Sequence, residues 1–155
     1  MRPIDPRITA LIPHREPFLW VDRIITVSKN AIITEKNIPK DLDIFRGHYP
    51  GHPILPGVLL CEAVFQTSAL LIAEMEAGKP EGTPGRLPVI TKVSDARFKR
   101  TVMPGDTVRI EVELKETLSS ASFFKGTVQV NGKTALRINF TTTFVEPEKI
   151  NQTTT

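Results

Sequence analysis

The stretch VLLCEAVFQTSALLIAEMEA, residues 58–77, runs for about five helical turns without a glycine or a proline. Most side chains of the predicted helix are apolar, and they occupy all of its faces, which is typical of a helix buried in a core. Four polar side chains argue against a membrane span: Glu62, Gln66, Glu74 and Glu76. A helix of this kind needs more cover than one sheet face of a monomer gives, so we also expect a dimer.

Segments with the character of β-strands surround this helix. Residues 18–27 and 31–38 are joined by Ser28-Lys29-Asn30 and form a predicted hairpin. Residues 107–114 alternate between apolar and polar side chains, as a half-buried antiparallel strand requires. Asn131-Gly132 favours a type I′ turn because both residues tolerate positive φ. The other predicted elements are a short helix at residues 6–12, strands at residues 89–102, 123–130 and 134–145, and loops at residues 39–57 and 78–88.

The predicted architecture is α+β, with an antiparallel sheet of about six strands against one long helix. The chain has 155 residues, of which 40% are hydrophobic and 24% charged, and this composition fits one folded domain. We place this domain at residues 1–147 and a solvated tail at residues 148–155. The single cysteine, Cys61, cannot form an internal disulfide, and the N-terminus lacks the apolar run of a secretory signal. We therefore expect a cytoplasmic protein.

The charge of the chain gives little information about its partners. The formal net charge is +3, which is too small to predict nucleic-acid binding. One dense basic run, Arg97-Phe98-Lys99-Arg100, stands out. It is either an ordinary solvated face or a docking patch for an acidic partner.

Two histidines stand in the loop that leads into the helix. Residues 47–58 contain three prolines and three glycines, which stiffen the backbone, as expected where a side chain is held for function. His48 and His52 have the spacing of zinc ligands on a helix. Pro50 and Gly51 exclude that helix, and no third ligand follows at a suitable spacing. We therefore expect no metal, and the family resemblance described below implies no cofactor.

Glu62 is a carboxylate with apolar neighbours near the start of the predicted helix. Its burial would cost several kcal/mol unless the group is paired or protonated, so its presence calls for a reason. Gln66 lies four residues further on, on the same face, where its amide could orient the carboxyl group. The alternative is a carboxylate that reaches the surface, where the helix dipole favours negative charge at the N-terminus.

The run from His48 to Gln66 resembles the active-site segment of the 3-hydroxyacyl-acyl-carrier-protein dehydratases of type II fatty-acid synthesis. Residues 11–23, LIPHREPFLWVDR, resemble the N-terminal signature of that family, and residues 96–106 resemble a later one. The resemblance implies the hot-dog fold, in which an antiparallel sheet wraps around a long central helix. It also implies a homodimer joined through the sheet edges, with three dimers often stacked, and an acyl carrier protein as partner.

In the family, the residues at the positions of His48 and Glu62 form the catalytic pair, one from each subunit. Dehydration needs a base for the C2 proton and an acid for the C3 hydroxyl, and these two residue types suit the two tasks. The backbone amide of Gly57, at the start of the helix, could stabilise charge on the thioester oxygen. The remaining expected assignments are substrate contacts at Gly57, Val58 and Phe98, an orienting role for Gln66, and carrier-protein docking at Arg97, Lys99 and Arg100.

Some features separate this chain from its relatives. Dehydratases that also isomerise their product carry aspartate at the positions of Glu62 and His52, so the residues present here favour plain dehydration. Glu16 and Trp20 depart from the usual tyrosine and leucine and leave the chain-length preference open. The alternative functions are an acyl thioesterase on the same fold and a noncatalytic protein that binds acyl carrier protein.

Overall fold

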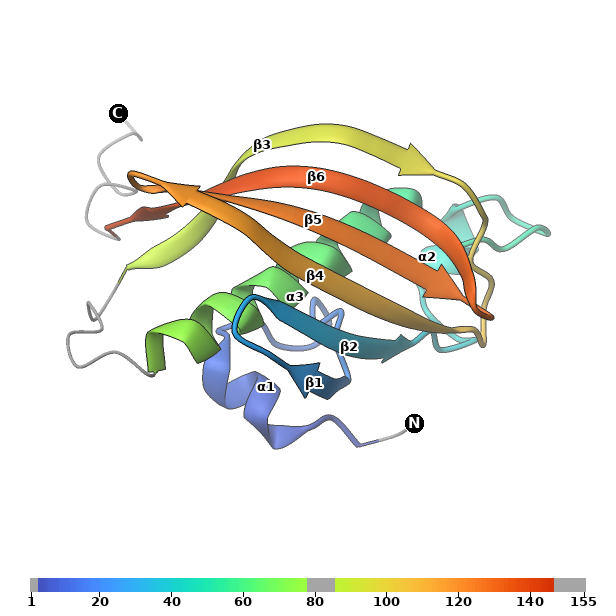
Figure 1. Ribbon diagram of the computed structural model, residues 1–155. Helices are drawn as coiled ribbons and strands as arrows, with labels where there is room; N and C mark the ends of the chain where they lie inside the picture. Colours follow the sequence, from blue (N-terminus) through green and yellow to red (C-terminus); the bar gives the residue numbers. More distant parts are fainter. Residues whose placement is uncertain (1–2, 78–85, 147–155) are drawn as a thin grey trace, which may run out of the picture.

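A six-stranded antiparallel sheet curves around one long helix, α3 (Figure 1). The computed structural model describes residues 3–77 and 86–146. The elements are α1 (Pro6–Leu11), β1 (Arg23–Val27), β2 (Ala31–Asn37), α2 (Ile44–Gly47), α3 (Gly57–Ala77), β3 (Leu87–Phe98), β4 (Thr107–Leu118), β5 (Ala121–Val130) and β6 (Lys133–Val145). The strand order β1-β2-β4-β5-β6-β3 places β1 and β3 at the two edges. The predicted α+β class, with six antiparallel strands and one long helix, is confirmed.

One side of α3 packs against the sheet, where it contacts β2, β3, β4, β5 and β6. Gly126 on β5 allows α3 to approach the sheet closely. A Cβ at this position would collide with Val64 Cγ1 of the helix and lie 3.1 Å from Ile138 Cγ2. An 18-residue window of α3 has a mean hydropathy of 1.6 and could cross a membrane by length and composition alone. Half of that window is buried inside the fold, so packing against the sheet accounts for its apolar sequence.

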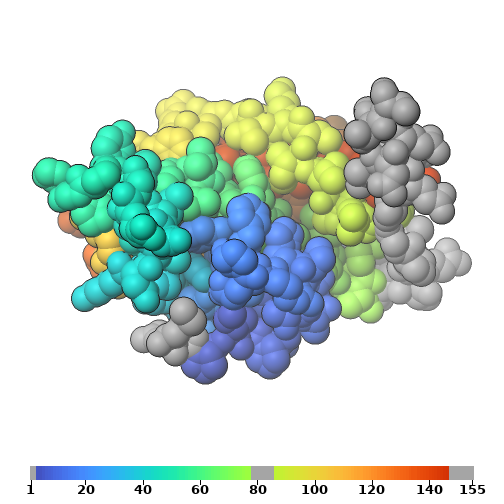
Figure 2. All heavy atoms as spheres, turned by 180° about the vertical axis from the view of Figure 1, so that it is seen from behind, coloured from blue at the N-terminus to red at the C-terminus, as the bar shows by residue number. Residues whose placement is uncertain are grey.

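The N-terminal segment covers the side of α3 that faces away from the sheet. In the reverse view of Figure 2, this segment (blue) lies across the helix (green). Gln66 of α3 joins the two: the Trp20 N–H donates to its Oε1 at 2.8 Å, and its Nε2 donates to the Phe18 carbonyl at 2.8 Å. Leu19 and Trp20 are buried in the core. Part of the cover that the apolar helix requires therefore comes from this segment.

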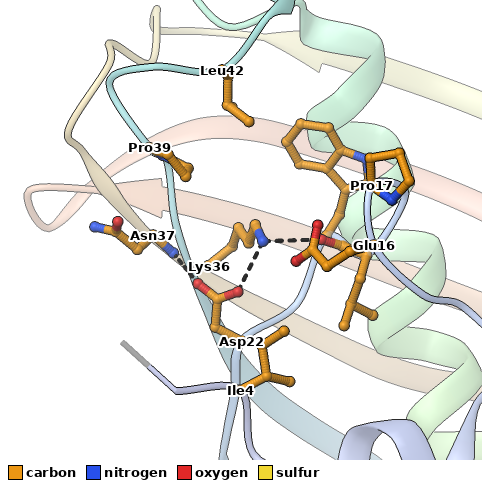
Figure 3. Close-up of a pocket in the computed structure, with 10 residues that line it drawn as sticks. Ile4, Glu16, Pro17, Asp22, Lys36, Asn37, Pro39 and Leu42 are labelled. Atoms are coloured by element: carbon orange, nitrogen blue, oxygen red, sulfur yellow. Dashed lines mark hydrogen bonds and ion pairs between the residues drawn. The ribbon is translucent and has the colours of Figure 1, made fainter. Parts of the chain in front are cut away.

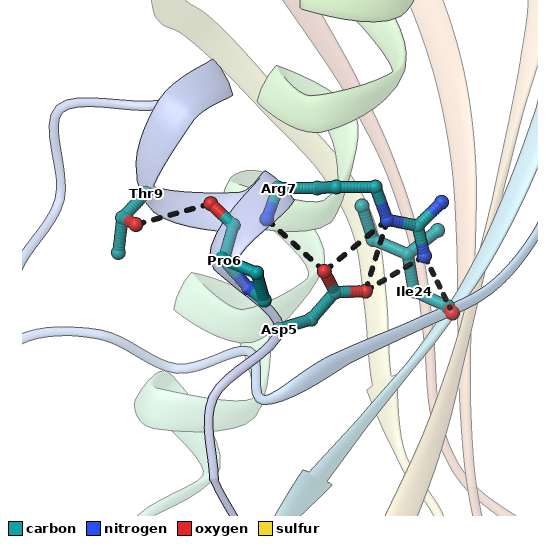
Figure 4. A network of polar contacts seen from close by, with 5 residues as sticks. All are labelled: Asp5, Pro6, Arg7, Thr9 and Ile24. Carbon is teal, nitrogen blue, oxygen red and sulfur yellow. Dashed lines mark hydrogen bonds and ion pairs between the residues drawn. The ribbon is translucent and has the colours of Figure 1, made fainter.

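Helix α1 begins with a cap that the sequence Asp5-Pro6-Arg7 supplies (Figure 4). The Asp5 carboxylate accepts the Arg7 backbone N–H at 3.0 Å and the Arg7 guanidinium at 2.7 Å. These hydrogen bonds lower the pKa of Asp5. Pro6 suits the first helical position because the N–H that it lacks would have no partner in the helix.

A buried ion pair joins β2 to the segment before β1 and borders a small pocket (Figure 3). Lys36 Nζ lies 2.8 Å from Asp22 Oδ1 and donates to the Leu19 carbonyl at 2.9 Å. The second carboxylate oxygen of Asp22 accepts the Asn37 N–H at 2.8 Å. The Trp20 ring lies beside this pair, with Lys36 Nζ 5.8 Å from its centroid. Both charges are thus paired as burial requires.

Several predicted boundaries are wrong, and side-chain contacts explain two of them. Residues 18–22 were expected in the first strand, but β1 begins at Arg23, because the backbone of Phe18 and Trp20 pairs with the Gln66 side chain. Strand β3, expected at residues 89–102, spans Leu87–Phe98, and the Val102 carbonyl accepts the Leu55 N–H instead. The short helix α2 lies inside the segment that was predicted as a loop. Residues 78–85 of the other predicted loop lie outside the described residues.

The Asn131-Gly132 turn forms as predicted between β5 and β6. Asn131 has φ 50° and Gly132 has φ 72°, and both values lie in the left-handed region. Two consecutive residues with positive φ are the mark of a type I′ turn, whose twist matches that of the flanking strands. The prediction from this dipeptide is confirmed.

Strand β3 forms an edge that is rich in exposed apolar side chains. It pairs with β6 on one side only. Its exposed large hydrophobic residues are Leu87, Ile90, Val93 and Phe98. A long edge strand with apolar side chains is a surface that proteins normally cover.

Candidate active site

The loop that carries His48 is built on a tight turn. The His52 N–H donates to the Tyr49 carbonyl at 2.8 Å, which closes a turn with Pro50 second and Gly51 third. Gly51 has φ 85°, which the third position of a type II turn requires, and proline is favoured at the second. Tyr49 itself has φ 53°, a left-handed conformation that is uncommon for a bulky residue. The turn therefore fixes the direction of the chain on either side of the imidazole.

The His48 ring has a defined tautomer. Its Nδ1 lies 2.8 Å from the carbonyl oxygen of Ile54, and a carbonyl can only accept a hydrogen bond. Nδ1 must therefore carry the proton, and the neutral ring leaves Nε2 with a free lone pair. The Tyr49 ring packs edge-on against the imidazole, with the centroids 4.6 Å apart. An imidazole that is fixed in position and has an unprotonated Nε2 is suited to accept a proton.

Gln66 anchors the carboxyl group of Glu62. The backbone N–H of Trp20 and the backbone carbonyl of Phe18 fix the orientation of the Gln66 amide, because the N–H can only donate and the carbonyl can only accept. The amide Nε2 then donates to Glu62 Oε1 at 2.9 Å. Glu62 is partly buried, with 22% of its side chain exposed. Gln66 thus holds Oε1, and Oε2 has no hydrogen-bond partner among the described residues.

His14 is a neighbour of Glu62 that the sequence analysis did not single out. Its Nε2 lies 3.9 Å from Glu62 Oε1. The residue belongs to the segment 11–23, whose family resemblance was recognised as a whole. A search of that segment for titratable side chains would have found it.

The start of α3 and the end of β3 meet at Gly57. A Cβ on Gly57 would lie 2.7 Å from Phe98 Cε1, so only glycine leaves room for this ring. The Gly57 N–H is among the first amides of α3, which have no acceptor inside the helix. Val58, one residue on, is exposed. Three residues predicted to contact substrate therefore lie close together, with an amide donor among them.

His48 and Glu62 are not joined within one chain. Both residues lie in the described part of the structure, and no hydrogen bond or ion pair links them there. The predicted pairing of the two side chains across a subunit boundary stays a prediction.

A groove of about 430 Å³ runs along the C-terminal half of α3. His14 stands in its wall, and Ala69 and Ala73 line it from the helix. These two alanines follow Glu62 by about two and three helical turns and so share its face. The rest of the lining is largely apolar: Leu11, Ile12, Pro13, Ile72, Glu76, Arg86, Leu87, Pro88, Val89 and Phe144.

Basic side chains gather on the sheet at the C-terminal end of β3. Arg97 and Lys99 line a depression of about 210 Å³ together with Lys125 of β5 and Arg137 of β6. The sequence pointed to the first two and missed the others, which pairing of β3 and β5 with β6 brings alongside. Arg97 also pairs with Asp95 at 2.6 Å. We call these four basic residues the basic patch; Arg100, the third predicted docking residue, does not line it.

A sheet wrapped around one long helix, with polar residues held at the helix start, defines a protein of the hot-dog class. Solved structures of similar fold include the dehydratase heterocomplex ApeI:P from Xenorhabdus doucetiae, with a TM-score of 0.79 at 18% identity over 94% of this chain and 95% of that one. An uncharacterized protein from Pyrococcus horikoshii has a TM-score of 0.64 at 17% identity over 94% of this chain and 96% of that one. The family model of the FabA-like domain matches residues 12–139, and the chain belongs to this family.

Curated relatives share much more sequence. The 3-hydroxyacyl-[acyl-carrier-protein] dehydratase FabZ of Clostridium perfringens is 38% identical over 83% of this chain and 88% of the relative. The protein of the same name from Clostridium acetobutylicum is 39% identical over 87% and 93%. The one from Klebsiella pneumoniae is 42% identical over 81% and 82%. The predicted family resemblance is confirmed.

Proposed function

We propose that this protein is a hydro-lyase that converts 3-hydroxyacyl thioesters on acyl carrier protein into trans-2-enoyl thioesters in fatty-acid biosynthesis. The observation that carries the proposal is the pair of fixed groups: an imidazole with a bare Nε2 and a carboxyl group anchored through one oxygen. Relatives named for this reaction support it. We place the reaction in the cytoplasm.

The residues divide the reaction into two proton transfers. His48 Nε2 takes the C2 proton, and Glu62 gives a proton from Oε2 to the C3 hydroxyl, so the C3–O bond breaks and water leaves. Negative charge builds on the thioester oxygen as the C2 proton departs. The Gly57 N–H, at the positive end of the α3 dipole, is placed to stabilise it. The elimination transfers no electrons and so needs no redox cofactor.

The proposal requires a second protomer. His48 and Glu62 do not meet within one chain, and the apolar edge of β3 offers a surface on which a second sheet can continue the first. A homodimer joined through β3 would build two sites, each with His48 from one subunit and Glu62 from the other. Stacking of three such dimers is part of the same expectation.

The test is a turnover assay on purified protein with 3-hydroxyacyl and enoyl thioesters of acyl carrier protein. Dehydration appears as the ultraviolet absorbance of the enoyl thioester, and hydration as its loss. A protein inactive in both directions would contradict the proposal. Release of free thiol, seen with a thiol-reactive dye, would indicate a thioesterase. Binding of acyl carrier protein without turnover, and unchanged by Glu62→Gln, would indicate the noncatalytic alternative.

We propose that the groove along α3 holds the acyl chain. His14 in its wall lies 3.9 Å from Glu62, beside which the reacting carbons would be placed, and Ala73 lies about 16 Å from Glu62 along the helix. Its largely apolar lining would bury methylene groups, each of which contributes about 0.8 kcal/mol.

Ala73→Phe should therefore shorten the preferred substrate. A phenyl ring would fill the far part of the groove, so kcat/KM for long acyl chains should fall roughly tenfold or more, with little change for short ones. The measurement is turnover over a ladder of 3-hydroxyacyl chain lengths. Ala10→Phe, at an exposed position of α1 outside the groove, is the control. An equal loss at every chain length would contradict the assignment.

We propose that acyl carrier protein, as an acidic partner, docks on the basic patch and on Arg100. Arg97 and Lys99 of the patch flank Phe98 in the sequence, and the Phe98 ring lies against Gly57 at the start of α3, so a carrier bound there would lie near the site. Attraction between exposed charges acts over about 10 Å at 0.1 M salt and raises the rate of encounter.

Charge reversal at Lys125 and Arg137 should weaken docking selectively. The Lys125→Glu, Arg137→Glu double variant should raise KM for carrier-bound substrate roughly tenfold, because two favourable charges become repulsive. Turnover of a small thioester that lacks the carrier protein should not change. Lys29→Glu, in the β1–β2 turn, is the control for a charge reversal away from the patch. An equal effect on both substrates would argue against docking at this patch.

A further inference from the structure

We infer that His14 is a positioning residue for the acid Glu62, donating a hydrogen bond from Nε2 to Glu62 Oε1 when substrate is bound. The inference rests on the proposed function. The observations that carry it are the 3.9 Å separation of these two atoms and the burial of the other ring nitrogen, Nδ1.

The burial of Nδ1 sets the tautomer of His14. Nδ1 is buried and has no hydrogen-bond partner among the described residues. A buried N–H without an acceptor is rarer and more costly than a bare acceptor, so Nδ1 carries no proton. The ring is therefore neutral with its proton on Nε2, the atom that faces Glu62.

The two neighbours of Glu62 act on the same oxygen. Gln66 Nε2 donates to Oε1 at 2.9 Å, and His14 Nε2 faces that atom as well. Oε2 is thus the oxygen that holds the transferable proton. After that proton goes to the departing hydroxyl, a carboxylate remains, and two donors on Oε1 stabilise it. A gap of 3.9 Å is too long for a hydrogen bond in the free protein, but catalytic hydrogen bonds often shorten when substrate binds.

The irregular segment that carries His14 is held in place by the next residue, Arg15. The Arg15 guanidinium donates to the carbonyls of Ile12, His14 and Thr9, each at 2.8 Å. His14 also stands in the wall of the proposed acyl groove. The imidazole is therefore fixed beside both the acid and the path of the substrate.

An unpartnered buried nitrogen makes no favourable contribution to folding, so its presence points to another role. The described residues contain one other such atom, Trp20 Nε1, in a side chain that borders the pocket of Figure 3. Of these two side chains, His14 is the one with a ring atom 3.9 Å from the Glu62 carboxyl group. Replacing it with an apolar side chain should therefore lower activity without lowering stability.

The experiment compares His14→Leu, which removes the donor, with His14→Gln, whose amide can place an N–H near the position of Nε2. We expect kcat of His14→Leu to fall about tenfold or more, with KM little changed and a thermal midpoint equal to or above that of the wild type. His14→Gln should recover a large part of the rate. A structural role would instead lower the thermal midpoint of His14→Leu, and His14→Gln would then not restore the rate.

A second measurement does not depend on turnover. The ¹⁵N chemical shifts of the His14 ring in the free protein should report a neutral imidazole with a bare Nδ1. A proton on Nδ1 would overturn the inference. A His14→Leu rate equal to that of an active wild type would also overturn the inference, but it would leave the proposed function standing. A wild-type chain with no dehydratase turnover overturns the proposed function, and this inference with it.

Discussion

His48→Ala should lower kcat by about 10²- to 10⁴-fold while the fold stays intact, because the variant lacks the proposed base for the C2 proton. The His48 ring makes one hydrogen bond among the described residues, to the Ile54 carbonyl, and lies in a loop, so its removal costs little packing. Glu62→Ala should lower kcat by a similar factor, because this variant lacks the proposed acid for the C3 hydroxyl. The measurement is the enoyl absorbance assay, with circular dichroism to check folding. His52→Ala is the control, since this exposed histidine lies on the same turn.

Pairing the two variants tests whether the site is shared between subunits. His48→Ala and Glu62→Ala chains with different affinity tags can be co-expressed and the mixed dimer purified through both tags. If each site takes His48 from one subunit and Glu62 from the other, one of the two sites in the mixed dimer is intact. We then expect about half of the wild-type activity. If each site is built within one chain, the mixed dimer is inactive.

Asp22→Ala should be the most damaging of the stability variants. Breaking a buried ion pair by removing one partner typically costs about 3–5 kcal/mol, because the remaining charge stays in the core. The side chains of Lys36 and Asp22 are only 8% and 12% exposed, so Lys36 would be stranded. For a domain of this size the thermal midpoint should fall by roughly 10 °C, as measured by calorimetry or circular dichroism.

An exposed pair on the same chain serves as the matched control for Asp22. Asp43 and Arg46 are 90% and 84% exposed, and surface pairs contribute little. Asp43→Ala should therefore leave the thermal midpoint nearly unchanged. Replacing both buried partners, as in Asp22→Asn with Lys36→Met, should recover much of the loss. Equal midpoints for Asp22→Ala and Asp43→Ala would contradict this account.

Local sequence signals predicted most of the elements. The predicted helix at residues 58–77 differs from α3 by one residue at its start, and the alternation after Thr107 and the Asn131-Gly132 turn both formed as expected. The segment before β1 was predicted wrongly, because its hydrogen-bond partner is Gln66, 46 residues from Trp20. Sequence patterns of period two carry no information about such a partner.

As with the fold, local sequence signals predicted part of the candidate site and missed the contacts between residues far apart in the sequence. Gln66 does bind Glu62, as the four-residue spacing implied, whereas the contact of Gly57 with Phe98 was not predicted. His14 was missed because its significance lies in a contact with a residue 48 positions away. Lys125 and Arg137 join the basic patch only through the pairing of strands that are separate in sequence. The pairing of His48 with Glu62 stays a prediction, since it needs a surface of a second copy.

The Gln66 amide has a pharmacological consequence. It is the link between the Glu62 carboxyl and the backbone of Phe18 and Trp20 in the N-terminal segment. A compound that displaced these two residues would release the amide and let the acid turn away. Such an inhibitor would act without competing with the thioester, so high substrate concentrations inside a cell would not relieve it.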